Sequence, residues 1–138
     1  MAFIVDASVA AGWLLPDERT EIADALAMRM QTEDAVAPDL FWHEARSLLV
    51  TAVRRTRIPE AAVYISLERL AMIPLRSAGA SDGVTVARLA IKHGLSAYDA
   101  AYLDLALREH LTLATLDKKL AAGARAEGVI VLGPLGAS

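Results

Sequence analysis

The chain has 138 residues, is 55% hydrophobic and 22% charged, and carries a formal net charge of −3. These values fit one domain spanning residues 1–138 with a buried core, and they exclude intrinsic disorder and nucleic-acid binding driven only by a basic surface. Charged residues interrupt the apolar ones every few positions, which excludes a transmembrane helix of about 20 apolar residues. The sequence contains no cysteine, which excludes disulfides and thiolate metal sites, and its N-terminal residues lack a signal-peptide pattern, which predicts a cytoplasmic protein.

In the first half of the chain, short apolar runs alternate with longer segments of helical periodicity. Ile22, Leu26 and Met30 illustrate the helical spacing, because they recur every four residues between charged positions. Proline opens two later helices, where its fixed backbone angle suits the first turn. The predicted elements are a strand at 3–5, helices at 9–15 and 18–30, a strand at 35–37, and helices opening at Pro38 and Pro59.

The second half continues this alternation, and its predicted helices begin at residues that favour helix caps. Ser81, Ser96 and Asp117 carry side-chain oxygens that can accept hydrogen bonds from a first helical turn, and Gly94 and Gly128 suit helix ends. The predicted elements are a run at 72–75 that could form a short strand, helices at 81–94 and 96–110, a strand at 111–115, a helix at 117–128, and a strand at 129–132.

The predicted strands are short and lack polar alternation, which is typical of parallel strands covered by helices on both faces. We therefore expect an α/β fold, namely a three-layer α/β/α sandwich with a central, mainly parallel, short-stranded sheet. Right-handed crossovers place the carboxyl ends of parallel strands at one edge of the sheet, where ligands bind in open α/β folds. Residues that directly follow strands are thus the first candidates for a functional site.

Four carboxylates lie just after predicted strands or at helix starts near the same edge: Asp6, Glu44, Asp99 and Asp117. Three of them also have a purely structural interpretation. Asp6 and Asp117 could be helix caps, and Asp99 could pair with Ser96 in a capping box. Four like charges in one cleft repel each other strongly, so a cluster of this kind needs a cation.

The composition restricts which cation such a cluster could hold. With no cysteine and three scattered histidines, oxygen ligands favour Mg²⁺ or Mn²⁺. Ser8 and Thr115 each lie two residues from one of the carboxylates and could orient them, or could satisfy only local turns. A site of this composition predicts metal-assisted hydrolysis of a phosphodiester, and a bound cation would also let an acidic protein recruit an anionic substrate.

Four segments of the chain resemble the motifs of PIN-domain ribonucleases, and particularly of the VapC-type toxins of type II toxin–antitoxin pairs. Their order and spacing carry the resemblance, which covers nearly the whole chain. The segments are residues 4–9, 38–49, 95–102 and 113–120.

The resemblance implies a metal-dependent endoribonuclease that cuts structured RNA such as tRNA or rRNA. It also implies a homodimer, a cognate antitoxin that blocks the cleft, and a supporting role for the Thr115 hydroxyl. Ser47 departs from the family pattern, because many relatives have Asn three residues after the helix glutamate. The carboxylates that the resemblance identifies as catalytic ligands of Mg²⁺ or Mn²⁺ are Asp6, Glu44, Asp99 and Asp117.

Two alternative functions come from other classes. In a haloacid-dehalogenase-like phosphatase, the aspartate after the first strand is a nucleophile and a second aspartate two residues later is the acid. Ser8 stands at that second position, and the chain has no room for a cap domain. A catalytically silent PIN-fold binding module is the other alternative, and the four carboxylates argue against it.

A short basic rim is expected to contact the substrate. Lys118 and Lys119 adjoin Asp117, and Arg46 lies two residues after Glu44. Together with Ser8, these three cations are the predicted substrate-binding residues, although each also suits a solvated helix surface.

Other charged residues have competing interpretations. Arg54, Arg55 and Arg57 could form an RNA-binding patch, or they could complement the dipole at a helix C-terminus. His43 is expected to lie outside the cleft, because successive helical residues point about 100° apart. Asp104 is expected to be a solvated or interface charge.

Overall fold

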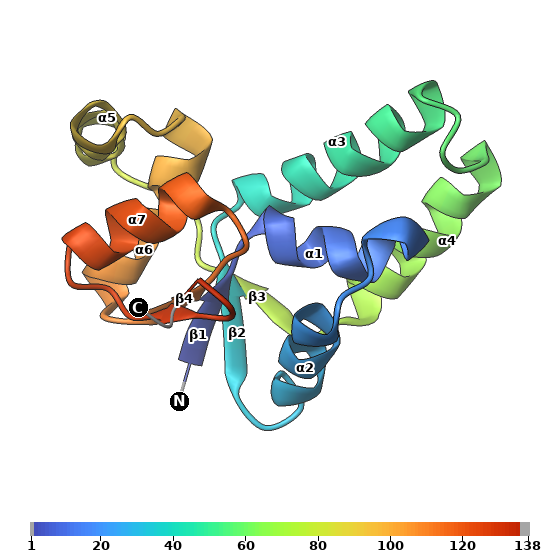
Figure 1. Ribbon diagram of the computed structural model, residues 1–138, viewed down its shortest axis with the longest axis horizontal. Coiled ribbons are helices and arrows are strands. Elements are labelled where there is room, and N and C mark those ends of the chain that lie inside the picture. The colour runs from blue at the N-terminus through green and yellow to red at the C-terminus, as the bar shows by residue number, and fades with distance from the viewer. Residues whose placement is uncertain (1, 136–138) are drawn as a thin grey trace.

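The computed structural model describes residues 2–135, which form a parallel sheet covered by helices on both sides (Figure 1). All four strand pairings are parallel, in the order β3-β2-β1-β4-β5, and Ile4 in the central strand lies opposite Val36 on one side and Leu113 on the other. The predicted parallel, short-stranded α/β sheet is therefore confirmed. The strands are β1 (Ala2–Val5), β2 (Asp34–Ala37), β3 (Leu75–Ser77), β4 (Thr112–Ala114) and β5 (Val131–Leu132).

The helices fall into two groups, one on each face of the sheet. The chain moves in one direction from β1 through β2 to β3 and in the opposite direction from β3 to β4 and β5, so right-handed crossovers place the two sets of connecting helices on opposite faces. Contacts follow this division, since α1 packs on α2 and α3 whereas α6 packs on α5 and α7. The elements are α1 (Ala7–Leu14), the 3₁₀ turn η1 (Pro16–Glu18), α2 (Glu21–Arg29), α3 (Leu40–Arg54), α4 (Glu60–Met72), α5 (Gly83–His93), α6 (Ala97–Glu109) and α7 (Lys118–Ala126).

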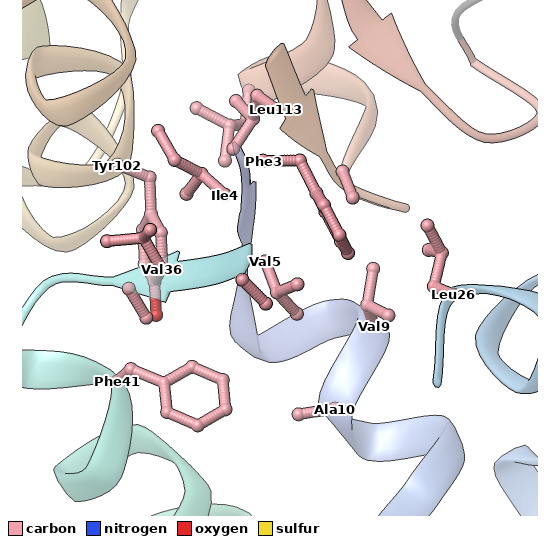
Figure 2. Close-up of a cluster of buried hydrophobic side chains, with 14 of the residues drawn as sticks. Phe3, Ile4, Val5, Val9, Ala10, Leu26, Val36, Phe41, Tyr102 and Leu113 are labelled. Atoms are coloured by element: carbon pink, nitrogen blue, oxygen red, sulfur yellow. The ribbon is translucent and has the colours of Figure 1, made fainter. Parts of the chain in front are cut away.

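The core lies on both faces of β1. Phe3, Ile4 and Val5 are all fully buried, and Figure 2 shows them surrounded by apolar side chains from neighbouring strands and from α1 and α3. Burial on both faces explains why β1 reads as a continuous apolar run rather than as an alternating one. It also fixes the end of β1, and with it the position of the next residue, Asp6.

The first two predicted helices differ slightly from their predicted bounds. The helix predicted at 18–30 begins at Glu21, because the Thr20 side chain accepts a hydrogen bond from the Ala23 backbone N–H (3.1 Å) and so caps α2. The preceding Pro16–Glu18 segment forms a 3₁₀ turn instead. The helix predicted at 9–15 already begins at Ala7.

The connection between α4 and α5 also differs from prediction. The run at 72–75 is not a strand, because Met72 completes α4 and β3 begins only at the end of that run. Asp82 rather than Ser81 caps α5, since its side chain accepts a hydrogen bond from the Thr85 backbone N–H (3.0 Å).

The strand order reverses beside β1. The connection after β1 leads to β2 on one side, while β4 lies on the other side, so the helices that follow β1 and β4 diverge to opposite faces. Such a switch point opens a crevice beyond the carboxyl ends of the two strands. Asp6 follows β1 and Asp117 comes three residues after β4, so both lie at this crevice. None of the helices within residues 2–135 combines the length and hydropathy needed to cross a membrane.

Candidate active site

A cleft of about 670 Å³ lies at this crevice, between α1, α3 and the start of α6. Its lining includes all four predicted carboxylates, so the prediction that they share one cleft at the carboxyl edge of the sheet is confirmed. Ser8 and Ser47 line it as well. The carboxylates are Asp6, Glu44, Asp99 and Asp117.

Asp6 is held by hydrogen bonds to both of its carboxylate oxygens. Its Oδ1 accepts from the Ser8 hydroxyl (2.5 Å) and from the backbone N–H groups of Ser8 (3.1 Å) and Val9 (3.3 Å). Its Oδ2 accepts from the Thr115 hydroxyl (2.6 Å). Asp6 therefore caps α1, as the structural interpretation expected, and also presents a fixed carboxylate at the cleft.

Ser8 and Thr115 connect the two strand ends that flank the crevice. The Ser8 hydroxyl accepts a hydrogen bond from the Leu116 backbone N–H (2.9 Å), and the Thr115 hydroxyl accepts one from the Asp117 backbone N–H (3.0 Å). Thr115 is fully buried and does not line the cleft itself. Both predicted hydroxyls thus orient Asp6, and they tie the start of α1 to the loop before α7.

Glu44 is held by a residue that the sequence analysis missed. Tyr102 on α6 donates its hydroxyl to Glu44 Oε1 (2.6 Å), and its ring is fully buried. In Figure 2 the Tyr102 side chain lies among apolar groups, with its oxygen directed toward α3. The signal was present in the sequence, because Tyr102 lies three residues after Asp99 and therefore on the same face of α6.

Asp99 and Asp117 occupy the starts of two helices. Asp117 caps α7, since its Oδ1 accepts from the Leu120 backbone N–H (2.9 Å). Ser96 caps α6 by accepting from the Asp99 backbone N–H (3.1 Å). Within residues 2–135 no group donates a hydrogen bond to the Asp99 carboxylate, so the reciprocal half of the predicted capping box is not formed.

The electrostatic environment of the cleft disfavours negative charge. Burial raises the pKa of Asp6 to about 6, against the opposing effect of the Ser8 and Thr115 hydrogen bonds and with a contribution from the Asp99 charge. Burial also raises the pKa of Glu44 and of Asp99, and neighbouring carboxylates add to both shifts. In the part of the chain that the structure describes, no Lys, Arg or His forms an ion pair with any of the four carboxylates. A cation is the group that would compensate them.

The side chains that could hold a cation offer only carboxylate and hydroxyl oxygens, and one of the carboxylates, that of Asp6, is fixed by hydrogen bonds. Such oxygen donors fit a hard divalent cation. The side chains are not yet gathered around one point: over residues 2–135 no three His, Asp or Glu side chains lie close enough together to hold one ion. Among these four carboxylates, that of Asp99 is the one to which no group in residues 2–135 donates a hydrogen bond, so it is the candidate ligand most free to move toward an ion.

The predicted basic rim lies outside the cleft. Arg46, Lys118 and Lys119 are exposed, and none of them lines the cavity. The arginines Arg55 and Arg57, for which two interpretations were open, do line it. Arg57 also forms ion pairs with Asp17 and Glu18.

Two expectations about other charged residues are wrong. His43 lines the cleft, because the cavity is broad enough to include two successive residues of α3 at its rim. Asp104 is neither solvated nor exposed: it is 4% exposed and pairs with Arg108 one helical turn later (Nε to Oδ2, 3.2 Å). A buried carboxylate with a cation at this spacing is a local ion pair of α6.

Comparisons with known proteins agree with this geometry. A family model described as "PIN domain" matches residues 3–126. Ribonuclease VapC3 from Pyrobaculum aerophilum is 34% identical over 130 residues, which span 88% of this chain and 93% of that protein. The crystal structure of PAE2754 from Pyrobaculum aerophilum has a TM-score of 0.71 at 25% identity, covering 95% of this chain and 83% of its own. FitAcB from Neisseria gonorrhoeae, at 20% identity, shares the fold with a TM-score of 0.66 over 97% of this chain and 98% of its own.

Proposed function

The chain belongs to the PIN-domain family, and from this premise we propose that it is a metal-dependent endoribonuclease that hydrolyses phosphodiester bonds in structured RNA. The observation that carries the proposal is the convergence of four carboxylates on one cleft at the switch point of the sheet. The family match over residues 3–126 leaves no support for the haloacid-dehalogenase-like alternative. A silent binding module is the alternative that the experiment below tests.

Each part of the cleft has a proposed role. The four carboxylates would hold Mg²⁺ or Mn²⁺, and the ion, when bound, lowers the pKa of water and neutralises charge on the phosphate. Ser8 and Thr115 keep the Asp6 carboxylate oriented, and Tyr102 does the same for Glu44. The hydroxyls act through the carboxylates, so they are positioning residues.

The proposed substrate is a structured RNA such as tRNA or rRNA, cut in a loop. Side chains cannot read base edges in the deep groove of an A-form helix, so we expect sequence to be read at unpaired nucleotides. Arg46, Lys118 and Lys119 are exposed near the carboxylates and would contact phosphates outside the cleft.

The experiment is to incubate the purified protein with RNA and Mn²⁺ or Mg²⁺ and to map the new ends. We expect discrete cuts with 5′-phosphate and 3′-hydroxyl ends that disappear with EDTA and in the Asp99→Asn variant. The matched control is Asp34→Asn, which makes the same chemical change at an exposed position at the start of β2, the opposite end of the strand from the cleft. Absence of cleavage, or cleavage that resists EDTA, would contradict the proposal.

We also propose two protein partners, a second copy of the chain and a cognate antitoxin that covers the cleft. The exposed apolar side chains of α4 support a protein contact on that helix, since Tyr64, Ile65 and Met72 are 57%, 51% and 84% exposed. Light scattering would test the homodimer, with an expected mass twice the 14.7 kDa of the chain. A monomeric mass would contradict it.

A further inference from the structure

The cleft has a second end, remote from the carboxylates. Four of the α3-side residues that line it follow one face of the helix and its C-cap: Glu44, Ser47, Thr51 and Arg55. At 1.5 Å per residue, Arg55 lies about 16 Å along the helix axis from Glu44. The cleft therefore runs along α3 from an acidic end to a basic end.

The two arginines at the basic end differ in their partners. Arg57 is held by η1, because its guanidinium donates to Asp17 Oδ2 (2.6 Å) and to Glu18 Oε1 (3.3 Å). Arg55 is exposed, and within residues 2–135 its guanidinium has no carboxylate partner. The charge of Arg57 is thus compensated by the protein, and the charge of Arg55 is not.

Between the two ends the cleft carries no charge beyond the Glu18 that pairs with Arg57. Leu15 and Leu48 contribute apolar surface, and Ser47 and Thr51 contribute hydroxyls. Apolar surface can pack against a base or a ribose, and hydroxyls can bond to sugar and phosphate oxygens. The cleft, of about 670 Å³, extends along α3 and offers groups for a base, a ribose and a phosphate, which are the groups that an unpaired strand exposes.

We propose that Arg55 binds a second backbone phosphate of the RNA strand whose scissile phosphate lies at the carboxylates. This inference rests on the proposed endoribonuclease function and adds a specificity element to it: the substrate must be unpaired over the whole span from Glu44 to Arg55. A phosphate at Arg55 compensates the arginine of the cleft that has no carboxylate partner among residues 2–135, and it fixes the register of the strand.

The test compares Arg55→Ala with Arg54→Ala, using single-stranded RNA and Mn²⁺. Arg54 is the matched control, because it is the adjacent exposed arginine of α3 and does not line the cleft. We expect Arg55→Ala to lower kcat/KM about tenfold through KM, with kcat within about twofold of wild type, as loss of one charged contact implies. The slope of log kcat/KM against log salt concentration should become shallower by about 0.7, the value for one phosphate contact on a single strand. Arg54→Ala should leave both quantities unchanged.

A length series makes the test specific for a distant phosphate. Substrates are shortened one nucleotide at a time from each end, and at one length the wild-type kcat/KM should drop to that of Arg55→Ala, because the contact is then missing in both. Wild-type cleavage with equal effects of the two arginine variants, or an Arg55→Ala defect that persists on the shortest substrates, would overturn the second phosphate site and leave the nuclease proposal intact. Absence of cleavage by the wild-type protein would instead overturn the proposed function, and the phosphate site with it.

Discussion

Asp6 and Glu44 differ from Asp99 and Asp117 in how the protein holds them. Side-chain hydroxyls, from Ser8 and Thr115 for Asp6 and from Tyr102 for Glu44, bind the first two. The second two lie at the starts of helices α6 and α7, and in the described part of the chain no hydroxyl donates a hydrogen bond to the carboxylate of either. One half of the site is thus positioned by groups of the protein, and the other half is positioned mainly by its helices.

This difference separates two ways of preparing a metal site. Hydroxyl donors keep a carboxylate in place without neutralising its charge, and orientation of ligands by such neighbours commonly changes metal affinity or activity by 10-fold to 100-fold. Asp99, whose carboxylate accepts no hydrogen bond within residues 2–135, would be the adjustable ligand of the proposed ion. The predictions below test whether the hydroxyl donors matter for activity and whether the held half carries more of the energetic cost than the adjustable half.

The largest effect is expected for Asp6→Asn. The substitution removes a ligand charge but keeps a side-chain oxygen that can cap α1, so cleavage should fall by at least about 100-fold while the protein remains folded. RNA cleavage and a thermal melt are the two measurements. Asp34→Asn should retain full activity, and near-normal cleavage by Asp6→Asn would remove Asp6 from the mechanism.

The next prediction concerns pH in the presence of EDTA. The pKa of Asp6 is raised by burial from 3.8 to about 6 in the folded protein, so folding favours its protonated form. The stability that this group contributes is complete below about pH 4 and is lost as the pH rises to about 6, a loss of about 3 kcal/mol. Urea unfolding at several pH values would measure it. Asp6→Asn should lack this loss, and saturating Mn²⁺ should offset it in the wild-type protein.

A smaller effect is expected for Tyr102→Phe, which releases Glu44 without removing it. Activity and Mn²⁺ affinity should each fall about tenfold, because Glu44 loses its only hydroxyl donor in the described structure. Tyr64→Phe is the matched control, since Tyr64 also donates its hydroxyl to a glutamate, Glu60 (2.8 Å), but on the exposed surface of α4. If both variants bind Mn²⁺ alike, measured calorimetrically, Tyr102 has no positioning role.

The smallest effect should come from the adjustable half. In EDTA at neutral pH, Asp99→Asn should be more stable than wild type by less than about 1 kcal/mol. The substitution removes a charge that is disfavoured first by partial burial and then by repulsion from Asp117, but it also loses a favourable charge in the first turn of α6. The gain is small because the Asp99 side chain is partly solvated. Chemical unfolding would measure the difference. A clear loss of stability would mean that Asp99 is a structural rather than an adjustable residue.

Much of the fold could be predicted from the sequence because local signals and the overall architecture agree. The apolar run at residues 3–5 is fully buried, and Ser96 and Asp117 cap helices as expected. The differences arose where two local signals competed. Thr20 caps α2, so this helix begins after the predicted start at residue 18. Asp82 caps α5 in place of the predicted Ser81.

The sequence predicted the part of the site whose residues directly follow strands. Asp6 and Asp117 follow strands that are adjacent in the sheet, so their convergence follows from topology. The sequence shows that Tyr102 shares a face of α6 with Asp99. Its contact to Glu44, however, joins two helices on opposite faces of the sheet, and no local pattern predicts that pairing. Asp104 was misassigned because helical spacing alone does not show which face of α6 is buried.

Asp6 and Asp117 each combine a cleft carboxylate with a helix cap. In a gene that accumulates random mutations, a substitution at either position that abolishes the proposed activity also tends to destabilise the protein and so to lower its amount in the cell. Most replacements at either codon remove the cap together with the charge, and a destabilised chain is cleared by cellular proteases. Among the residues that cap helices well, Asn also keeps the size and shape of the aspartate side chain, whereas Ser, Thr and Gly do not, so an abundant yet inactive lineage has few mutational routes. Inactive copies of such a chain should therefore carry Asn at these two positions more often than any other residue.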